Sequence, residues 1–454
     1  MSKETKKQIV RDLYLLITML MAFSSAVWLW YYNVGVGWDK GYFGTRTLAT
    51  VGVLYCIVYF SFSKMYKAHK IGAYHLTELS FSQMLSFGIA DAALYGSAFF
   101  WFHNFERIQV HLFVLAFMVQ GFVVIVLTFC MNRLHARYDG PRKVAIIYGD
   151  QGYQLLYQKM KDFSYRYRIL GCFEENTDKE ELYRILAECK DVYLYEVNEE
   201  LRQELLLYCE KKRKDIHFSL SIADISLRGC DVSHFFDTPF LRNRKADVQW
   251  YYPIIKRFFD IILSLIALVI ASPFMLITAI AIKIEDGGHV FYTQKRLTAK
   301  NKTFSIIKFR SMKENSEDVA RLASEGDDRI TKVGHVIRRF RIDEIPQLFN
   351  ILKGDMSIVG PRPERPEIAS EYEKELPEFA MRLKVKAGLT GYAQVYGKYN
   401  TTPLDKLKLD LIYISQRSVM MDLQIMFYTV KILFIPESTE GVAEGQTTAQ
   451  REIS

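Results

Sequence analysis

The sequence predicts a membrane protein with three parts: a four-helix transmembrane bundle, a Rossmann-like α/β domain, and a mainly α (α+β) domain that begins with a re-entrant membrane helix. Half of the 454 residues are hydrophobic although the mean hydropathy is zero, so the apolar residues must be concentrated in separate segments. Four apolar runs precede residue 132, strand-like and helix-like segments alternate after residue 141, and a fifth apolar run carries a proline at its middle. About three domains also fit this length.

The predicted bundle occupies residues 1–138. The runs 13–32 and 110–131 are free of charge and long enough to cross a hydrocarbon layer of about 30 Å, and the runs 47–63 and 79–105 are weaker candidates. Basic residues cluster before the first run, between the second and third, and after the fourth. Basic loops stay in the cytoplasm, so both ends of the bundle are predicted to be cytoplasmic.

Charge and cysteine usage exclude several classes of protein. The net charge of +8 suits a protein at an anionic membrane face, and basic and acidic residues are interleaved, so no nucleic-acid partner is predicted. The six cysteines are scattered and the nine histidines show no metal-binding spacing. We therefore expect free thiols in a reducing compartment and no zinc site.

Residues 139–250 are predicted to form the Rossmann-like domain. Strand-like segments at 143–148, 167–173, 191–196 and 216–220 alternate with helical stretches, which indicates a parallel sheet. The loop 149–152 has two of the three glycines that a dinucleotide fingerprint requires. The interpretation is a structural or regulatory domain that has lost nucleotide binding.

The fifth apolar run, 261–282, belongs to a predicted re-entrant helix over residues 251–285. Ser272 and Pro273 lie at its midpoint, where proline breaks or bends a helix. Basic residues flank both ends, so a helix that enters the membrane and returns to the same face satisfies both flanks. A simple kinked transmembrane helix is the alternative.

The candidate catalytic residues lie in residues 286–436. Pro346 and Gly354 delimit a short helix, which places Asp343 and Glu344 at its N-terminal end. Two capping carboxylates are the plain interpretation. Two nearby arginines favour a functional interpretation: Arg338 lies upstream, and Arg362 is held between Pro361 and Pro363. A stiff backbone suits bidentate capture of phosphate by arginine.

Acids and fixed arginines together are what phosphoryl transfer requires. A carboxylate can attack phosphorus when a divalent cation and arginines neutralise the phosphate oxygens, and carboxylates supply hard oxygen ligands for Mg²⁺. Asp343 and Glu344 are therefore the predicted metal ligands.

Residues 253–436 resemble the catalytic unit of the bacterial polyprenyl-phosphate sugar-1-phosphate transferases, the monotopic phosphoglycosyl transferases that initiate exopolysaccharide, capsule and O-antigen assembly. The resemblance rests on five motifs in order: Lys256-Arg257 with Ser272-Pro273, Lys308-Phe309-Arg310-Ser311-Met312, Asp343-Glu344, the run 354–363, and the run 388–395. The bundle and the degenerate Rossmann-like domain resemble the long members of this family.

The resemblance implies a mechanism and its substrates. Asp343 would attack the sugar-bearing phosphate of a nucleoside diphosphate sugar, such as a UDP-hexose, and undecaprenyl phosphate would then take the phosphosugar. Glu344 would share Mg²⁺ with Asp343. The positions implied in phosphate or substrate binding are Arg296, Lys308, Arg310, Arg338, Pro361, Arg362, Pro363 and Asp422. The implied location is the cytoplasmic face of the bacterial inner or plasma membrane, with a homodimer as a further expectation.

Three departures from the family pattern concern the loops expected to select nucleotide and sugar: Ala387 in place of a proline, the run 396–398, and the run 296–298. Two other functions stay open, a membrane-anchored nucleotide-sugar oxidoreductase or dehydratase and a non-catalytic regulator of polysaccharide assembly. Residues 437–454 are expected to form a polar tail.

Overall fold

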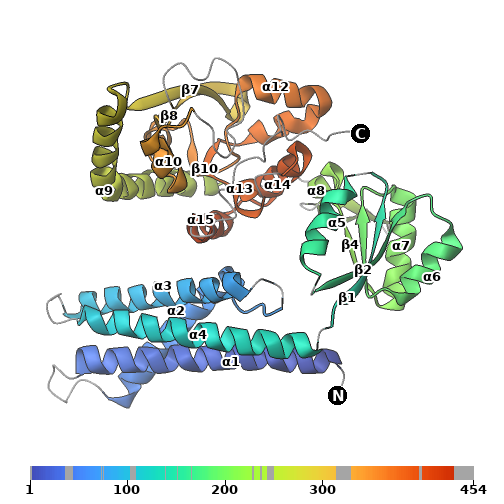
Figure 1. Cartoon of the computed structure of the whole chain (residues 1–454), viewed down its shortest axis with the longest axis horizontal. Helices are drawn as coiled ribbons and strands as arrows, with labels where there is room; N and C mark the ends of the chain where they lie inside the picture. Colours follow the sequence, from blue (N-terminus) through green and yellow to red (C-terminus); the bar gives the residue numbers. More distant parts are fainter. Residues whose placement is uncertain are drawn as a thin grey trace. The chain divides into compact units, whose positions relative to one another are not determined.

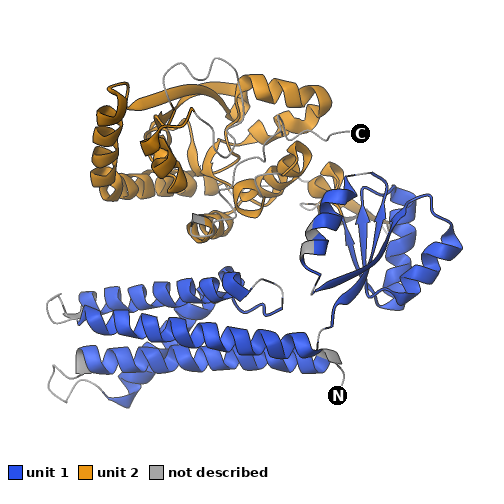
Figure 2. Ribbon diagram, in the orientation of Figure 1, with its two compact units in different colours: residues 1–218 blue, residues 219–454 orange. Residues whose placement is uncertain are grey.

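The computed structural model describes residues 3–35, 44–72, 74, 76–102, 109–138, 140–150, 152–164, 166–227, 230–235, 238–242, 250–312, 329–397 and 401–433. The predicted tail, 437–454, lies outside these residues. The chain divides into two compact units, residues 1–218 and residues 219–454 (Figure 2).

The first unit begins with four long helices, α1 (Lys3–Trp30), α2 (Thr45–Met65), α3 (Leu76–Phe102) and α4 (Val110–Tyr138), with one π-helical turn after α1 (Tyr31–Gly35). Helix α1 packs against α2 and α4, and α3 packs against the same two helices (Figure 1). Within the described residues α1, α2 and α4 are long and apolar enough to cross a membrane, and α9 is the fourth such helix. Helix α3 does not meet that measure, and its buried Asp91 accepts a hydrogen bond of 2.7 Å from the Tyr55 hydroxyl.

The predicted parallel sheet follows the bundle and is confirmed. Its strands are β1 (Arg142–Tyr148), β2 (Tyr167–Glu174), β3 (Asp191–Tyr195) and β4 (Asp215–Phe218), in the order β2-β1-β3-β4. Helices α5 (Tyr153–Asp162), α6 (Lys179–Glu188) and α7 (Glu199–Lys212) connect them. The core on one face contains Ile147, Leu186 and Leu205, all fully buried.

The Glu175 side chain, from the residue after β2, lies against Gly149 in the loop that follows β1. Its carboxylate accepts a hydrogen bond of 2.9 Å from the Asn198 backbone N–H, and a Cβ added at Gly149 would lie 2.9 Å from the same oxygen atom. A negative charge therefore lies beside the strand ends where a Rossmann fold binds an anionic dinucleotide.

The second unit contains the remaining elements, which bury several hydrophobic clusters. Before its long helix come α8 (Ile222–Leu227), β5 (Asp231–Phe235) and β6 (Thr238–Arg242), and after it come the antiparallel strands β7 (Phe291–Thr298) and β8 (Lys302–Phe309), joined by a 3₁₀ turn (Ala299–Asn301). The rest are α10 (Lys332–Arg339), η4 (Ile342–Glu344), α11 (Gln347–Lys353), β9 (Ser357–Val359), α12 (Pro366–Glu375), η5 (Pro377–Lys384), β10 (Gly388–Thr390), α13 (Tyr392–Tyr396), α14 (Pro403–Gln416) and α15 (Val419–Leu433).

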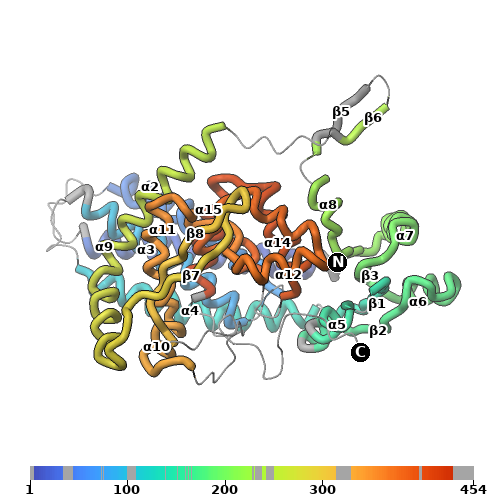
Figure 3. The backbone as a smooth tube through the Cα atoms, turned by 90° about the horizontal axis from the view of Figure 1, so that it is seen from above, coloured from blue at the N-terminus to red at the C-terminus, as the bar shows by residue number. Residues whose placement is uncertain are grey.

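Helix α9 (Tyr252–Asp286) is the long apolar helix of the second unit. It bends sharply into two arms, which Figure 1 shows from the side and Figure 3 from above. The helix is continuous through Ser272 and Pro273, so the expected break is a bend, for which an internal proline is the usual cause. Val269 and Ile270 near this point are 74% and 66% exposed. Such a large apolar surface is typical of a segment that contacts lipid.

Polar contacts fix the N-terminal part of α9 to the rest of the unit. The Arg257 guanidinium donates to the backbone carbonyls of Ile351 and Leu352 at the end of α11, at 2.6 and 2.7 Å. The Asp260 carboxylate accepts a hydrogen bond of 3.0 Å from the Ile358 backbone N–H in β9. The apolar helix is thus connected to the two elements that flank the predicted catalytic motifs.

Candidate active site

The acid pair lies in a short 3₁₀ turn between two helices. Helix α10 ends at Arg339, and Arg341 adopts a left-handed backbone conformation with φ of 54°. A non-glycine residue in this region carries backbone strain, and here it turns the chain directly into Asp343 and Glu344. The predicted helix follows as α11, with Pro346 before it and Gly354 after it at φ of 98°. The predicted short helix is therefore confirmed, and Asp343 and Glu344 lie in the 3₁₀ turn that precedes it.

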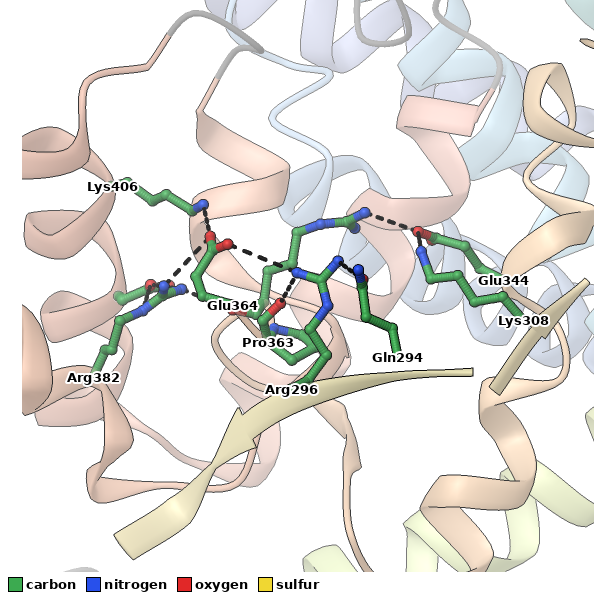
Figure 4. A network of polar contacts seen from close by, with 10 residues as sticks. Gln294, Arg296, Lys308, Glu344, Pro363, Glu364, Arg382 and Lys406 are labelled. Atoms are coloured by element: carbon green, nitrogen blue, oxygen red, sulfur yellow. Dashed lines mark hydrogen bonds and ion pairs between the residues drawn. The ribbon is translucent and has the colours of Figure 1, made fainter. Parts of the chain in front are cut away.

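Glu344 is held by two cations that come from different elements. Arg362 Nη2 donates to Glu344 Oε1 at 2.9 Å, and Lys308 Nζ in β8 donates to the same oxygen at 3.4 Å (Figure 4). Burial opposes ionisation, since the side chain is only 13% exposed, but Arg362 and then Lys308 outweigh it and lower the pKa of Glu344. Glu344 is therefore ionised at neutral pH.

Asp343 has a different environment from its neighbour. Burial and then the Glu344 charge raise its pKa, against the effects of Lys308, Arg338 and Arg362. Within the described part of the chain, its carboxylate makes no hydrogen bond or ion pair. Arg338 is directed by a hydrogen bond of 2.8 Å from its Nε to the Ser311 hydroxyl. Within the described residues, Asp343 is therefore a carboxylate that three cations affect electrostatically without contacting it directly.

The Pro361-Arg362-Pro363 turn is held through all three of its carbonyl groups. The Pro361 carbonyl accepts from the Gly388 N–H at 2.9 Å, that of Arg362 accepts from Arg382 Nη2 at 2.9 Å, and that of Pro363 accepts from Arg296 Nη1 at 3.2 Å. The two prolines and these bonds together restrict the backbone from which Arg362 reaches Glu344.

Close packing of β9 and β10 explains the glycines of the two flanking motifs. A Cβ at Gly388 would lie 2.1 Å from the Gly360 nitrogen, and one at Gly391 would lie 2.1 Å from the Gly360 oxygen. No side chain fits at such distances, so the runs 354–363 and 388–395 meet backbone to backbone.

A third carboxylate, which is not among the predicted site residues, lies on the other side of this turn. The Glu364 carboxylate pairs with Lys406, with Arg382 Nη1 at 3.5 Å, and with Arg296 Nη1 at 4.0 Å (Figure 4). Arg382 also pairs with the buried Asp410 at 2.8 Å. Glu364 follows the predicted turn directly, which could have drawn attention to it. Arg382, Lys406 and Asp410 carry no motif of their own.

The structure brings together only some of the predicted site residues. Lys308, Glu344 and Arg362 are in direct contact, with Asp343 and Arg338 beside them. Arg296 instead lies beneath the turn, where it bonds to the Pro363 carbonyl and to Gln294 Oε1 at 2.7 Å.

Two further predicted residues make structural contacts away from the acid pair. Arg310 pairs with Asp286 at the end of α9. Asp422 in α15 accepts hydrogen bonds from Tyr252, Tyr413 and Lys256, each within 2.9 Å. Both residues connect α9 to the surrounding fold. Ser272 and Pro273 lie within α9 itself.

The acid pair also suits the metal that the sequence predicts. No group of three or more His, Cys, Asp or Glu side chains that could hold a metal ion gathers anywhere in the described residues. Mg²⁺ is commonly bound by one or two carboxylates together with water and substrate phosphates, so a larger protein cage is not required. Asp343 and Glu344 are two such carboxylates. Burial and then the Glu344 charge raise the pKa of Asp343, and a bound cation would relieve the second of these effects.

A family model matches the part of the chain that contains this site. Residues 251–436, from α9 to the end of the described C-terminal helices, match the model described as bacterial sugar transferase. The match includes the acid pair, the Pro-Arg-Pro turn and the Glu364 cluster.

Curated relatives align over a similar length of the chain. A UDP-N-acetylgalactosamine-undecaprenyl-phosphate N-acetylgalactosaminephosphotransferase of Aeromonas hydrophila is 44% identical over 186 residues, which cover 40% of this chain and 44% of the relative. A UDP-glucose:undecaprenyl-phosphate glucose-1-phosphate transferase of Caulobacter vibrioides is 38% identical over 190 residues, 40% of this chain and 71% of the relative.

A third relative is aligned over nearly its whole length. The exopolysaccharide production protein PSS of Rhizobium leguminosarum is 37% identical over 198 residues, which cover 41% of this chain and 97% of the relative. The chain spans less than half the length of the Aeromonas relative. The chain belongs to the bacterial sugar transferase family, the polyprenyl-phosphate sugar-1-phosphate transferases that its motifs resemble.

Proposed function

We propose that this protein transfers a hexose-1-phosphate from a nucleoside diphosphate sugar, in the first instance a UDP-hexose, to undecaprenyl phosphate. The reaction would be the first membrane step of an extracellular polysaccharide, at the cytoplasmic face of a bacterial inner or plasma membrane. The observation that carries the proposal is the unpaired Asp343 beside Glu344, which Arg362 and Lys308 hold.

The reaction proceeds in two displacements at one phosphorus atom. A carboxylate oxygen of Asp343 attacks the sugar-bearing phosphorus, and the bond from this phosphorus to the bridging oxygen breaks, so that UMP leaves with that oxygen. A phosphate oxygen of undecaprenyl phosphate then attacks the same phosphorus, and Asp343 leaves as a free carboxylate. The product is undecaprenyl diphosphate hexose.

The charges around Asp343 support this role. Asp343 needs no general base, because an ionised carboxylate is itself the nucleophile. Lys308, Arg338 and Arg362 all act on Asp343 electrostatically and can stabilise the charge on the transferring phosphoryl group. The Arg362 side chain is 40% exposed, so its remaining donors can reach a bound phosphate.

Asp343 and Glu344 would hold Mg²⁺, which when bound neutralises charge on the donor phosphates. Glu344 stays ionised beside its two cations, so it can supply a metal ligand across the pH range of the reaction.

Helix α9 supports the part of the proposal that concerns the lipid substrate. Its apolar surface is exposed around Val269 and Ile270, and its N-terminal part is bonded to α11, which begins directly after the acid pair. A re-entrant helix of this kind would hold the soluble donor's site at the membrane surface, where the phosphate of a polyprenyl lipid lies.

The two alternative functions lack comparable support. An oxidoreductase would need the α/β domain to bind a dinucleotide, and Glu175 places a carboxylate beside the strand ends where the pyrophosphate would lie. A non-catalytic regulator leaves the assembly of Asp343, Glu344 and Arg362 without a purpose.

The test supplies the membrane-embedded protein with undecaprenyl phosphate, Mg²⁺ and a panel of nucleotide sugars labelled in the sugar. Transfer of one label into the lipid fraction, with release of the nucleoside monophosphate, supports the proposal and identifies the sugar. Absence of transfer from every donor contradicts it.

A further inference from the structure

Arg382 lies on the opposite side of the Pro-Arg-Pro turn from the acid pair and bonds directly to the backbone of Arg362. It belongs to the 3₁₀ segment η5 and is 3% exposed. Its Nη2 atom donates to the Arg362 carbonyl at 2.9 Å, so the group that fixes this carbonyl is itself a buried charged side chain. Burial of such a charge is costly unless every donor is used.

Acidic partners hold the Arg382 guanidinium in one orientation. Asp410, which is 1% exposed, accepts from Nε at 3.1 Å and lies 2.8 Å from Nη2. Glu364 lies 3.5 Å from Nη1, and the ring of Phe379 packs against the guanidinium at 4.8 Å from its centroid. Two carboxylates and one ring thus hold the planar guanidinium group in an orientation in which Nη2 points at the turn.

The Glu364 carboxylate is part of the same group of contacts. It pairs with Lys406 from α14 as well as with Arg382. Burial raises the pKa of Glu364, but the charges of Lys406 and Arg382 outweigh this effect and lower it. Arg296, the third cation on Glu364, donates to the Pro363 carbonyl. Two charged side chains, Arg382 and Arg296, therefore anchor the carbonyls of Arg362 and Pro363, while the Gly388 backbone N–H holds the Pro361 carbonyl.

We propose that Arg382, supported by Asp410 and Glu364, is a positioning residue that sets the place of the Arg362 guanidinium against Glu344. This inference rests on the proposed function, in which Arg362 faces the donor phosphate. The Arg362 side chain is long and 40% exposed, so without a fixed backbone it would sample many orientations. Transition-state stabilisation requires the charge in one place, and small displacements are costly in rate.

The contacts distinguish Arg382 from a substrate ligand. Its Nε and Nη2 donate within the protein, its Nη1 lies 3.5 Å from Glu364, and the side chain is only 3% exposed, so it is shielded from a bound phosphate. Its effect on the reaction must pass through Arg362.

The experiment is a double-mutant cycle in the full-length protein in lipid nanodiscs. Arg382→Lys keeps the charge beside Asp410 and Glu364, but one ammonium group cannot reproduce the planar fork. In the wild-type background kcat should fall by about ten- to a hundredfold, with KM for the donor changed by less than about threefold. In an Arg362→Lys background the same change should lower kcat by less than about twofold more. Lys384→Gln, an exposed residue in η5, is the matched control.

Equal loss in both backgrounds would overturn the inference, since it would mean that Arg382 acts independently of Arg362. A second variant, Arg382→Gln with Asp410→Asn, removes the charge pair together and excludes an unpaired buried carboxylate as the cause. It should lose kcat as Arg382→Lys does, and retained wild-type kcat would contradict the proposal.

Hydrogen exchange supplies a readout that does not depend on turnover. The Gly388 amide donates to the Pro361 carbonyl, so peptides containing Gly388 should exchange faster in Arg382→Lys than in the wild type, while Lys384→Gln stays unchanged. Unchanged exchange in Arg382→Lys would contradict the positioning role of Arg382. A wild-type protein that transfers no sugar phosphate contradicts the proposed function separately, and the exchange measurement still decides the role of Arg382.

Discussion

The Arg362 Nη2 atom lies 2.9 Å from Glu344 Oε1, and Lys308 shares that oxygen at 3.4 Å. This contact joins the Pro-Arg-Pro turn to the turn that carries the acid pair. It leaves Glu344 ionised and Asp343 as the carboxylate without a protein partner in the described residues, so the two acids have different electrostatic environments.

Neutralising Glu344 should change the pH dependence of the reaction. The pKa of Asp343 is raised by burial and by Glu344, so activity should be lost as the pH falls through that raised value. Glu344→Gln removes the like charge and leaves Lys308 and Arg362 facing Asp343, which should lower its pKa. The acidic limb of the kcat/KM profile should therefore move to lower pH, while Glu375→Gln, at an exposed residue of α12, should leave it in place. A limb that moves to higher pH would contradict this electrostatic assignment.

Asp343→Asn should stabilise the protein. Because the folded-state pKa of Asp343 is raised, its protonated form favours folding, and this contribution is lost as the pH rises through the raised pKa. At neutral pH the ionised carboxylate opposes folding, and the neutral amide removes that cost. The thermal midpoint should rise by about 2–4 °C for each kcal/mol recovered, measured by a thermal melt in nanodiscs. A lower midpoint at pH 7 would show that the charge is stabilised in the folded state.

Magnesium should raise the thermal midpoint of the wild type in the absence of nucleotide sugar. Ligand binding to the folded state adds about 2.7 kcal/mol at a concentration a hundred times Kd. The double variant Asp343→Asn with Glu344→Gln should lose this shift, and Glu375→Gln should keep it. An equal shift in the double variant would place magnesium elsewhere.

Asp422→Asn should weaken the fold without changing donor binding. Asp422 accepts hydrogen bonds from Tyr252, Tyr413 and Lys256, so the amide leaves the Lys256 ammonium with a weaker partner. The expected loss is about 1–3 kcal/mol of unfolding free energy. A Lys256→Gln, Asp422→Asn double variant should recover part of it. A large rise in the donor KM with unchanged stability would instead support the substrate-binding role implied by the resemblance.

Labelling of single cysteines should report the same face on both sides of α9. In a background with the six native cysteines replaced, Trp250→Cys and Lys302→Cys, both at exposed positions, should react with an impermeant reagent from the cytoplasmic side only. Labelling from opposite sides would mean that α9 crosses the membrane.

The sequence predicted helices and strands better than it predicted which side chains contact one another. Strong local signals located the parallel strands, the apolar helices and α11 between Pro346 and Gly354. The contacts of Arg382, Asp410 and Lys406 could not be predicted in this way, because η5 and α14 meet the turn only in the folded chain.

The same limit explains why two residues of the predicted site lie away from it. Arg310 lies two residues after Lys308, directly past the end of β8, but its partner is Asp286 in α9. Asp422 belongs to α15 and faces Tyr252 and Lys256. A motif identifies residues that matter to a family, and only tertiary packing separates those that contact phosphate from those that support the fold.

The most direct test of the proposed chemistry is to trap the phosphosugar on Asp343. The wild-type protein is mixed with Mg²⁺ and the active nucleotide sugar without lipid acceptor, quenched in acid and digested, and the peptide that contains residue 343 is weighed by mass spectrometry. We expect a hexose-phosphate increment on Asp343, its loss when undecaprenyl phosphate is added before the quench, and no increment or UMP release in Asp343→Asn. Sustained transfer to lipid by Asp343→Asn would contradict the role of Asp343 as nucleophile.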